Sequence, residues 1–382
     1  MKLVLITGGA GFIGSNLAIK LINEGYKVRI LDLLSCQVHG PEPEKTSHLY
    51  ISIKDKVDFI RGSVCSADDL KRAIIGVSYI IHLAAETGTG QSMYEIDKYS
   101  TVNIGGTSLL MDLIANSNHD IERIIIASSR AIYGEGKYLS KTKGYVYPLC
   151  RSNELLAKSM FDCQIDGDDD DLELVATDEE SKIHPTSVYG ITKQVQEQIV
   201  LCVCNSIGIE AVALRYQNVF GPGQSLRNPY TGILSIFSTN ILNNNSINIF
   251  EDGKESRDFI YIDDVIDATF LSLTKPNISN QTFNVGTGIP IDVLTVAQKL
   301  IDNFGINVPI KITGQYRLGD IRHNYASISK INNILGFTPK WTFEEGIKMF
   351  VNWVKSQDVN PDLYSISIDE LKSKGLLGAS DI

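Results

Sequence analysis

The feature that most constrains this chain is its opening stretch, KLVLITGGAGFIGSNL, where an apolar run leads directly into a cluster of glycines. Residues 3–6 are all aliphatic, which predicts a short strand buried on both faces. Gly9, Gly11 and Gly14 then fit the spacing G-x-G-x-x-G. Gly8 begins the related pattern T-G-x-x-G-x-x-G. Between a strand and a helix, such glycines make a tight turn, let backbone approach a pyrophosphate and allow close packing, so they predict a dinucleotide-binding turn.

A second strand and an acidic residue follow this turn at the expected distance. We expect a helix over residues 13–23 and a strand over residues 26–31 that closes on Asp32. The diphosphate would lie at the positive end of the helix near Phe12, where free N–H groups face it. An acid about twenty residues after the glycines binds the ribose of NAD, and its charge would repel the extra phosphate of NADP. The pattern therefore predicts NAD, and a purely structural glycine turn is the alternative.

The composition is that of an ordinary globular protein of 382 residues, with 43% hydrophobic residues and a formal net charge of −10. This acidic balance argues against a general binder of nucleic acid or of acidic membranes. No apolar run reaches the roughly 18 residues of a membrane span. The six cysteines show no C-x-x-C spacing, so we expect neither a disulfide framework nor a metal site, and a reducing cytoplasm is the expected location.

Strands and helices alternate through the first 130 residues, which predicts an α/β fold with a Rossmann-like, doubly wound parallel sheet. Further strands are expected over residues 57–60, 77–83, 121–128 and 210–216, and helices over residues 68–75, 93–116 and 343–355. His82 lies in one of these strands, and we expect a core histidine with a satisfied ring. The last third has a different texture. We expect an NAD-binding domain over residues 1–220 and a smaller mixed α/β substrate lobe over residues 221–382.

Between about residues 135 and 182 the alternation stops, and polar and acidic side chains dominate. Residues 168–171 are four consecutive aspartates, but the run lacks the ligand spacing and the closing glutamate of a calcium loop. Cys150 and Cys163 could be what remains of a metal knuckle, yet two sulfurs without a histidine at ligand spacing make a poor site. We therefore expect a solvated surface insertion.

Ser129, Tyr189 and Lys193 are the candidate catalytic residues. Ser129 follows a predicted strand, at the sheet edge where parallel sheets bind ligands. Tyr189 and Lys193 lie one helical turn apart on a later helix. Lowering the pKa of a tyrosine from about 10 to 7 requires roughly 4 kcal/mol of preferential stabilisation of the phenolate. The Lys193 ammonium and a positively charged nicotinamide are the expected sources, and Ser129 would hydrogen-bond the substrate oxygen.

The order of these motifs resembles that of the extended short-chain dehydrogenase/reductases, the nucleotide-sugar epimerases and dehydratases. The resemblance covers nearly the whole chain. It rests on Thr7-Gly8-x-x-Gly11-x-x-Gly14, Asp32, His82-Leu83-Ala84-Ala85, Asn103, Ser129-x-x-x-Tyr133-Gly134, Tyr189-x-x-x-Lys193, Arg215-x-x-Asn218-x-x-Gly221-Pro222, Arg257-Asp258 and Arg317-x-Gly319-Asp320.

The resemblance implies a role for each matching position. Tyr189 would be the catalytic base and Lys193 would bind the nicotinamide ribose. The other residues expected to hold NAD are Gly8, Gly11, Phe12, Ile13, Gly14, Asp32, Ser63, Val64, Leu83, Ala84, Ala85 and Asn103. The residues expected to hold a nucleoside-diphosphate sugar are Glu86, Ser129, Arg130, Asn218, Arg227, Phe250, Arg257, Arg317 and Asp320. The family also implies a homodimer, formed through the helices that carry Asn103 and Tyr189.

One departure from the family pattern bears on the reaction. In the 4,6-dehydratases, Thr-Asp-Glu stands where this chain has Ser129, Arg130 and Ala131. The Asp and the Glu are the acid and base that eliminate water, and this chain lacks both. The insertion, together with residues 86–92 and 224–230, resembles the dTDP-L-rhamnose 4-epimerases, within a group that includes the UDP-glucose 4-epimerases. We therefore expect an NAD-dependent 4-epimerase of a nucleoside-diphosphate hexose that works through a transient 4-keto sugar.

Three alternatives stay open. A 4,6-dehydratase would need another carboxylate near the sugar, and Glu86 is the candidate. A 4-ketohexose reductase or dehydrogenase would release its cofactor at each turnover. A non-catalytic NAD-binding scaffold would bind the cofactor without turnover.

Overall fold

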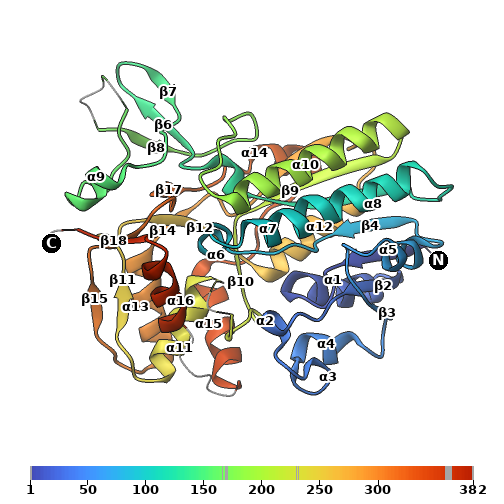
Figure 1. Cartoon of the computed structure of the whole chain (residues 1–382), viewed down its shortest axis with the longest axis horizontal. Coiled ribbons are helices and arrows are strands. Elements are labelled where there is room, and N and C mark those ends of the chain that lie inside the picture. The colour runs from blue at the N-terminus through green and yellow to red at the C-terminus, as the bar shows by residue number, and fades with distance from the viewer. Residues whose placement is uncertain are drawn as a thin grey trace.

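The computed structural model describes residues 2–165, 167, 171–228, 230, 232–357 and 364–380. Its centre is a seven-stranded sheet with the order β13-β9-β5-β4-β1-β2-β3, in which neighbouring strands are parallel (Figure 1). The strands are β1 (Leu3–Thr7), β2 (Lys27–Asp32), β3 (Asp58–Arg61), β4 (Tyr79–His82), β5 (Arg123–Ser129), β9 (Glu210–Tyr216) and β13 (Gln281–Val285). The strand order reverses between β1 and β4, so a ligand crevice is expected at their carboxyl ends. The predicted doubly wound parallel sheet is confirmed.

Helices cover both faces of this sheet. One face packs against α5 (Ala67–Ile74), α8 (Gly106–Ala115) and α10 (Val188–Ile207), and the other against α1 (Phe12–Asn23) and α12 (Ile262–Thr274). Within β1, Leu5 packs on the face covered by α5, α8 and α10, whereas Val4 and Ile6 pack on the face covered by α1 and α12. The sides differ because successive strand side chains point to opposite faces. Burial on both faces explains why the strands read as continuous apolar runs. Figure 1 shows α8 and α10 side by side.

The stretch expected as one helix over residues 93–116 is divided. It consists of α7 (Ile96–Tyr99), a π-helical turn η1 (Ser100–Gly105) and α8. A Cβ at Gly106 would lie 2.7 Å from the Val64 side chain, so this glycine lets the helix approach the turn after β3. Asn103 is buried within this π turn, and such turns are common at functional sites.

The second lobe consists of small sheets and the helices that cover them. Its strands are β10 (Asn218–Phe220), β11 (Ile247–Ile249), β12 (Ser256–Tyr261), β14 (Pro290–Asp292), β15 (Ile310–Ile312), β16 (Gln315–Arg317), β17 (His323–Asn324) and β18 (Leu377–Ala379). Its helices are α11 (Ile233–Leu242), α13 (Val293–Phe304), α14 (Ser329–Leu335), α15 (Phe343–Lys355) and α16 (Tyr364–Ser373). The helix expected over residues 343–355 therefore matches α15.

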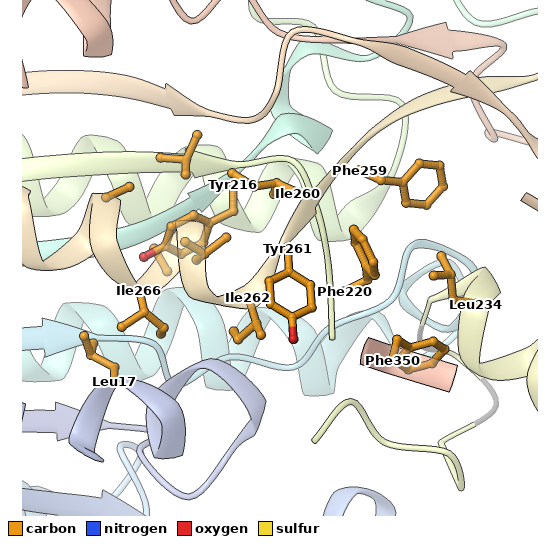
Figure 2. Packing of buried hydrophobic residues seen from close by; sticks show 14 of the residues in the cluster. Leu17, Tyr216, Phe220, Leu234, Phe259, Ile260, Tyr261, Ile262, Ile266 and Phe350 are labelled. Atoms are coloured by element: carbon orange, nitrogen blue, oxygen red, sulfur yellow. The ribbon is translucent and has the colours of Figure 1, made fainter. Parts of the chain in front are cut away.

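One continuous hydrophobic core joins the two lobes. Figure 2 shows it between Leu17 of α1, Ile262 of α12 and Phe350 of α15. The expected division at residue 220 remains a prediction, and two later elements belong with the first lobe. Strand β13 completes the central sheet, and α12 covers one of its faces, although both come after residue 220.

The insertion is more ordered than a solvated loop. Strands β6 (Lys137–Ser140), β7 (Gly144–Val146) and β8 (Glu173–Val175) form an antiparallel sheet beside α9 (Asn153–Ala157) (Figure 1). Buried Arg151 fastens it to the second lobe, because its Nη1 donates to Glu251 Oε2 at 2.7 Å and its Nε to Glu135 Oε1 at 3.2 Å. These partners lie far apart in the sequence, so local patterns could not reveal them. Of the four consecutive aspartates, residues 168–170 lie outside the described residues.

Two features are absent from the described part of the chain. None of its helices has the length and apolar composition that a bilayer crossing requires. Within the same residues, no three histidine, cysteine or acidic side chains form a group that could hold a metal ion. All six cysteines are free thiols.

Candidate active site

A cavity of about 650 Å³ lies at the carboxyl ends of the central strands, between the two lobes. We call the wall around the glycine turn and Asp32 the cofactor half, and the wall around Arg130, Arg257 and Arg317 the sugar-nucleotide half. The expected site residues that line the cavity are Gly8, Gly11, Phe12, Ile13, Gly14, Asp32, Ser63, Val64, Leu83, Ala84, Ala85, Glu86, Ser129, Arg130, Tyr189, Lys193, Asn218, Phe250, Arg257, Arg317 and Asp320. Their individual roles remain predictions.

The glycine turn is shaped for a group that needs close backbone approach. Gly8 has φ +69°, and a Cβ there would lie 2.8 Å from the backbone nitrogen of Ala84. A Cβ on Gly14 would lie 2.6 Å from Gly9 Cα, so helix α1 packs directly on the turn. Helix α1 begins at Phe12 without a side-chain cap. Its first N–H groups are therefore available to an anion, which fits the diphosphate of a dinucleotide.

Asp32 is fixed at the edge of the same half. Its Oδ2 accepts from the Ala10 N–H at 2.9 Å and its Oδ1 from the Leu34 N–H at 2.8 Å. Each oxygen keeps a lone pair that could accept a ribose hydroxyl, so the residues present fit NAD. His39, which sequence reasoning missed, lies with Nε2 3.9 Å from Asp32 Oδ1 and also lines the cavity. Burial lowers the pKa of His39 despite the nearby carboxylate, so its ring stays neutral.

The three candidate catalytic residues, Ser129, Tyr189 and Lys193, all line the cavity. Burial raises the pKa of Tyr189, while the Ser129 hydroxyl and the Arg130 guanidinium act in the opposite direction. The Lys193 ammonium donates to Gln196 Oε1 at 2.7 Å, and burial lowers the pKa of Lys193 to about 7. The expectation that Lys193 lowers the pKa of Tyr189 remains a prediction, and Arg130 is a further cation that acts in this direction.

Arg130 connects the catalytic strand to the second lobe. Its Nε donates to Asn218 Oδ1 at 2.6 Å. Burial, and then the charge of Arg257, lowers the pKa of Arg130 to about 9. A guanidinium therefore stands beside Tyr189 at the position where the dehydratases carry an acid. Glu86, the alternative carboxylate, lines the cavity with its Oε2 3.4 Å from the Lys98 ammonium.

Two expected site residues do not line the cavity. Asn103 is fully buried, and it fastens the wall by accepting from the Glu86 N–H at 2.8 Å and donating to Thr192 Oγ1 at 2.9 Å. Arg227 is exposed beside Gly40. The sequence-based assignment of both residues to ligand binding remains a prediction, and neither side chain lines the cavity.

His82 confirms its expected structural role. Its Nδ1 lies 2.6 Å from Thr7 Oγ1 and its Nε2 lies 2.9 Å from Thr107 Oγ1. Burial lowers the pKa of His82 to about 3, so the ring is neutral at physiological pH.

Charged groups shape the sugar-nucleotide half. Arg257 Nη2 donates to Asp320 Oδ1 at 3.2 Å, and the Arg317 guanidinium lies 4.8 Å from the centre of the Phe250 ring. Burial opposes ionisation of Asp320, but Arg257 and Arg317 hold the pKa of Asp320 below its ordinary value. Both Nη groups of Arg257 donate within the protein, to Ser256 O, Arg322 O, Asp320 Oδ1 and Ile321 O. The two guanidiniums therefore give this wall a positive charge that favours an anion such as a diphosphate.

The C-terminal segment closes this half and was missed by sequence reasoning. Tyr364 and Leu371 of α16 line the cavity, and Tyr364 Oη accepts from Arg317 Nη2 at 3.1 Å. Glu370 accepts from Tyr94 Oη at 2.9 Å and from the Tyr230 hydroxyl. Strand β18 pairs with β16, which carries Arg317. The segment is mostly polar and has no motif that would have predicted a place in the cavity wall.

Comparison with known proteins identifies the family. The model of the NAD dependent epimerase/dehydratase family matches residues 4–155 and 162–286. The chain belongs to this family. It is 34% identical to the dTDP-L-rhamnose 4-epimerase of Burkholderia thailandensis over 93% of this chain and 96% of that protein. This membership confirms the expected resemblance and NAD as the cofactor.

Solved structures of other family members share the fold. The UDP-glucose 4-epimerase of Thermotoga maritima, solved with UDP-glucose, has a TM-score of 0.74 and 28% identity over 92% of this chain and 98% of that one. The UDP-glucuronic acid 4-epimerase of Bacillus cereus, solved with UDP-glucuronic acid and NAD, has a TM-score of 0.75 and 25% identity over 92% and 99%.

Proposed function

We propose that this protein is an NAD-dependent 4-epimerase of a nucleoside-diphosphate hexose, with dTDP-L-rhamnose or a similar dTDP- or UDP-sugar as substrate. The observation that carries the proposal is the combination of Ser129, Tyr189 and Lys193 in one cavity with Arg130 in place of the dehydratase acid. An arginine cannot donate and recover a proton at neutral pH as a carboxyl group does. Proton transfer at the C4 hydroxyl therefore has a catalyst in this cavity. Elimination of water lacks the acid at position 130 and would fall to Glu86, which is paired with Lys98.

Tyr189 acts as the base that removes the proton from the C4 hydroxyl. When bound, NAD accepts the hydride from C4 and returns it. Ser129 hydrogen-bonds the C4 oxygen, and Lys193 binds the nicotinamide ribose. The 4-keto sugar turns within the cavity and presents its other face. Return of the hydride to that face inverts the configuration at C4, and no net oxidation occurs.

The direction of strand β12 supports one orientation of the substrate. Phe259 and Arg257 lie on one side of this strand, about 6.6 Å apart, and both line the cavity together with Glu255, which directly precedes the strand. Phe259 pairs with Asn218, which binds Arg130 beside Tyr189. The sugar therefore lies near Asn218, the diphosphate near Arg257, and the nucleoside near Phe250 at the far end.

We also place the protein in the cytoplasm, in carbohydrate biosynthesis, as a homodimer. The six free thiols are consistent with a reducing compartment. Ile191 on α10 is exposed, and Leu109 and Leu113 on α8 are half-buried against the core; these apolar side chains would form the dimer contact.

A panel of dTDP-, UDP- and GDP-sugars, followed by NMR of the products, tests the proposal. We expect interconversion of C4 epimers without added reductant. The Tyr189→Phe variant should lose at least about a hundredfold in kcat and still bind NAD. A 4-keto-6-deoxy product would replace the proposal with a dehydratase, and net reduction of NAD would replace it with a dehydrogenase.

A further inference from the structure

A buried chain of hydrogen bonds leads from Lys193 across two helices to the central sheet. Lys193 Nζ donates to Gln196 Oε1 at 2.7 Å, and Gln196 Nε2 donates to Thr107 Oγ1 at 2.7 Å. Thr107 contacts His82 Nε2 at 2.9 Å, and His82 Nδ1 contacts Thr7 Oγ1 at 2.6 Å. All five side chains are at most 3% exposed. This series of hydrogen bonds therefore ends at Thr7, the residue that precedes Gly8 of the glycine turn.

The direction of each bond follows from the donors and acceptors available. The Thr107 hydroxyl donates to the Asn103 carbonyl at 2.6 Å. Its oxygen must therefore accept from both Gln196 Nε2 and His82 Nε2. His82 then carries its proton on Nε2, and its Nδ1 accepts from the Thr7 hydroxyl. One arrangement satisfies every group, so the amide of Gln196 is oriented with its oxygen toward Lys193.

We propose that Gln196 is a positioning residue for Lys193, and that its fixed amide oxygen sets both the place of the ammonium in the cavity and the pH range over which it stays charged. The inference rests on the proposed function, in which a charged Lys193 holds the nicotinamide ribose beside Tyr189. A neutral amide suits this task, because it orients the ammonium without neutralising the charge. Nothing in the Y-x-x-x-K motif predicts this third residue.

The surroundings of Lys193 leave few other influences on its charge. Glu197 on α10 favours the ammonium, but its carboxylate is shared with Arg215, whose Nη2 lies 2.6 Å from Glu197 Oε1. On β4, His82 is neutral. Tyr189 lies one turn away on the same helix, and α8 presents the uncharged Thr107. A change at position 196 should therefore act on Lys193 directly.

Two substitutions with opposite charge effects test the proposal. In holoenzyme, Gln196→Leu removes the acceptor, so the high-pH limb of kcat should move about one unit lower. Gln196→Glu adds a negative charge beside the ammonium, so the same limb should move about one unit higher. The control is Gln198→Leu, a matched change at an exposed position of the same helix, which should leave the profile unchanged.

A second measurement does not depend on epimerisation. The affinity for NAD is measured by calorimetry between pH 6 and pH 9. The pH above which this affinity weakens should be lower in Gln196→Leu, and higher in Gln196→Glu, than in the parent protein. Equal profiles in all variants, or shifts in the same direction for both substitutions, would overturn the role of Gln196. If no nucleotide sugar is epimerised but the NAD profiles move apart as expected, the proposed function fails and the role of Gln196 stands.

Discussion

The cofactor half and the sugar-nucleotide half of the cavity hold their shapes in different ways. In the cofactor half, close backbone packing and backbone hydrogen bonds hold the shape. Gly8 and Gly14 have no room for a Cβ, and Asp32 accepts from two backbone N–H groups. In the sugar-nucleotide half, contacts of buried charged side chains hold the shape. Arg257 pairs with Asp320, and Arg317 lies over the ring of Phe250, in each case a partner from a distant segment. We therefore expect binding in the cofactor half to be sensitive to substitutions that add bulk. We expect binding in the sugar-nucleotide half to be sensitive to substitutions that change charge and to salt concentration.

The largest effect is expected in the cofactor half. In Gly14→Val, the new Cβ would meet Gly9 Cα at 2.6 Å and the Gly8 carbonyl oxygen at 2.7 Å. Backbone cannot yield as a flexible side chain can, so NAD binding should be lost, measured by calorimetry. Gly25→Ala is the control, because Gly25 has open space around it and a φ of +84°. It should cost about 1 kcal/mol of stability and leave NAD binding intact; equal losses in both variants would contradict the steric account.

The second largest effect is expected where the insertion meets the second lobe. Arg151→Met leaves the buried carboxylates of Glu135 and Glu251 without this partner, and should lower the free energy of unfolding by about 3 kcal/mol. Denaturant titration measures it. Lys158→Met, which removes an exposed pair with Glu154, should cost under about 1 kcal/mol. Similar values for the two variants would show that the insertion is only a surface appendage.

These two regions also show what the sequence can and cannot predict. The turn from Gly8 to Gly14, Asp32 and the pair Tyr189 and Lys193 are set by local spacing within strand and helix units, so their place in one cavity was predictable. The partners of Arg151 lie up to 169 residues away. His39, Gln196 and Tyr364 likewise acquire their roles from contacts between distant segments, and no local pattern distinguishes them.

A smaller effect is expected within the sugar-nucleotide half. Arg317→Lys keeps the charge but loses the planar group that lies over Phe250 and donates to Tyr364. The KM for the nucleotide sugar should rise about tenfold, since a charge-assisted contact contributes roughly 1.5–3 kcal/mol. The affinity for NAD should not change. An equal loss of NAD affinity would mean that the two halves are not independent.

The smallest effect is expected at the junction of the halves. Arg130 lowers the pKa of Tyr189, and Tyr189 must be ionised to act as the base. Arg130→Met should therefore raise that pKa and move the low-pH limb of kcat upward by about one unit. Arg130→Lys, which keeps the charge, should move it less. A shift toward lower pH would contradict the electrostatic role of Arg130.

Hydride transfer at C4 and back is the central claim, and an isotope label tests it most directly. The holoenzyme is incubated with a nucleotide sugar that carries deuterium at C4, and the product is examined by NMR. The account predicts a C4 epimer that keeps its deuterium at C4, with no net reduction of NAD. Deuterium found at C6 or lost to water would contradict it.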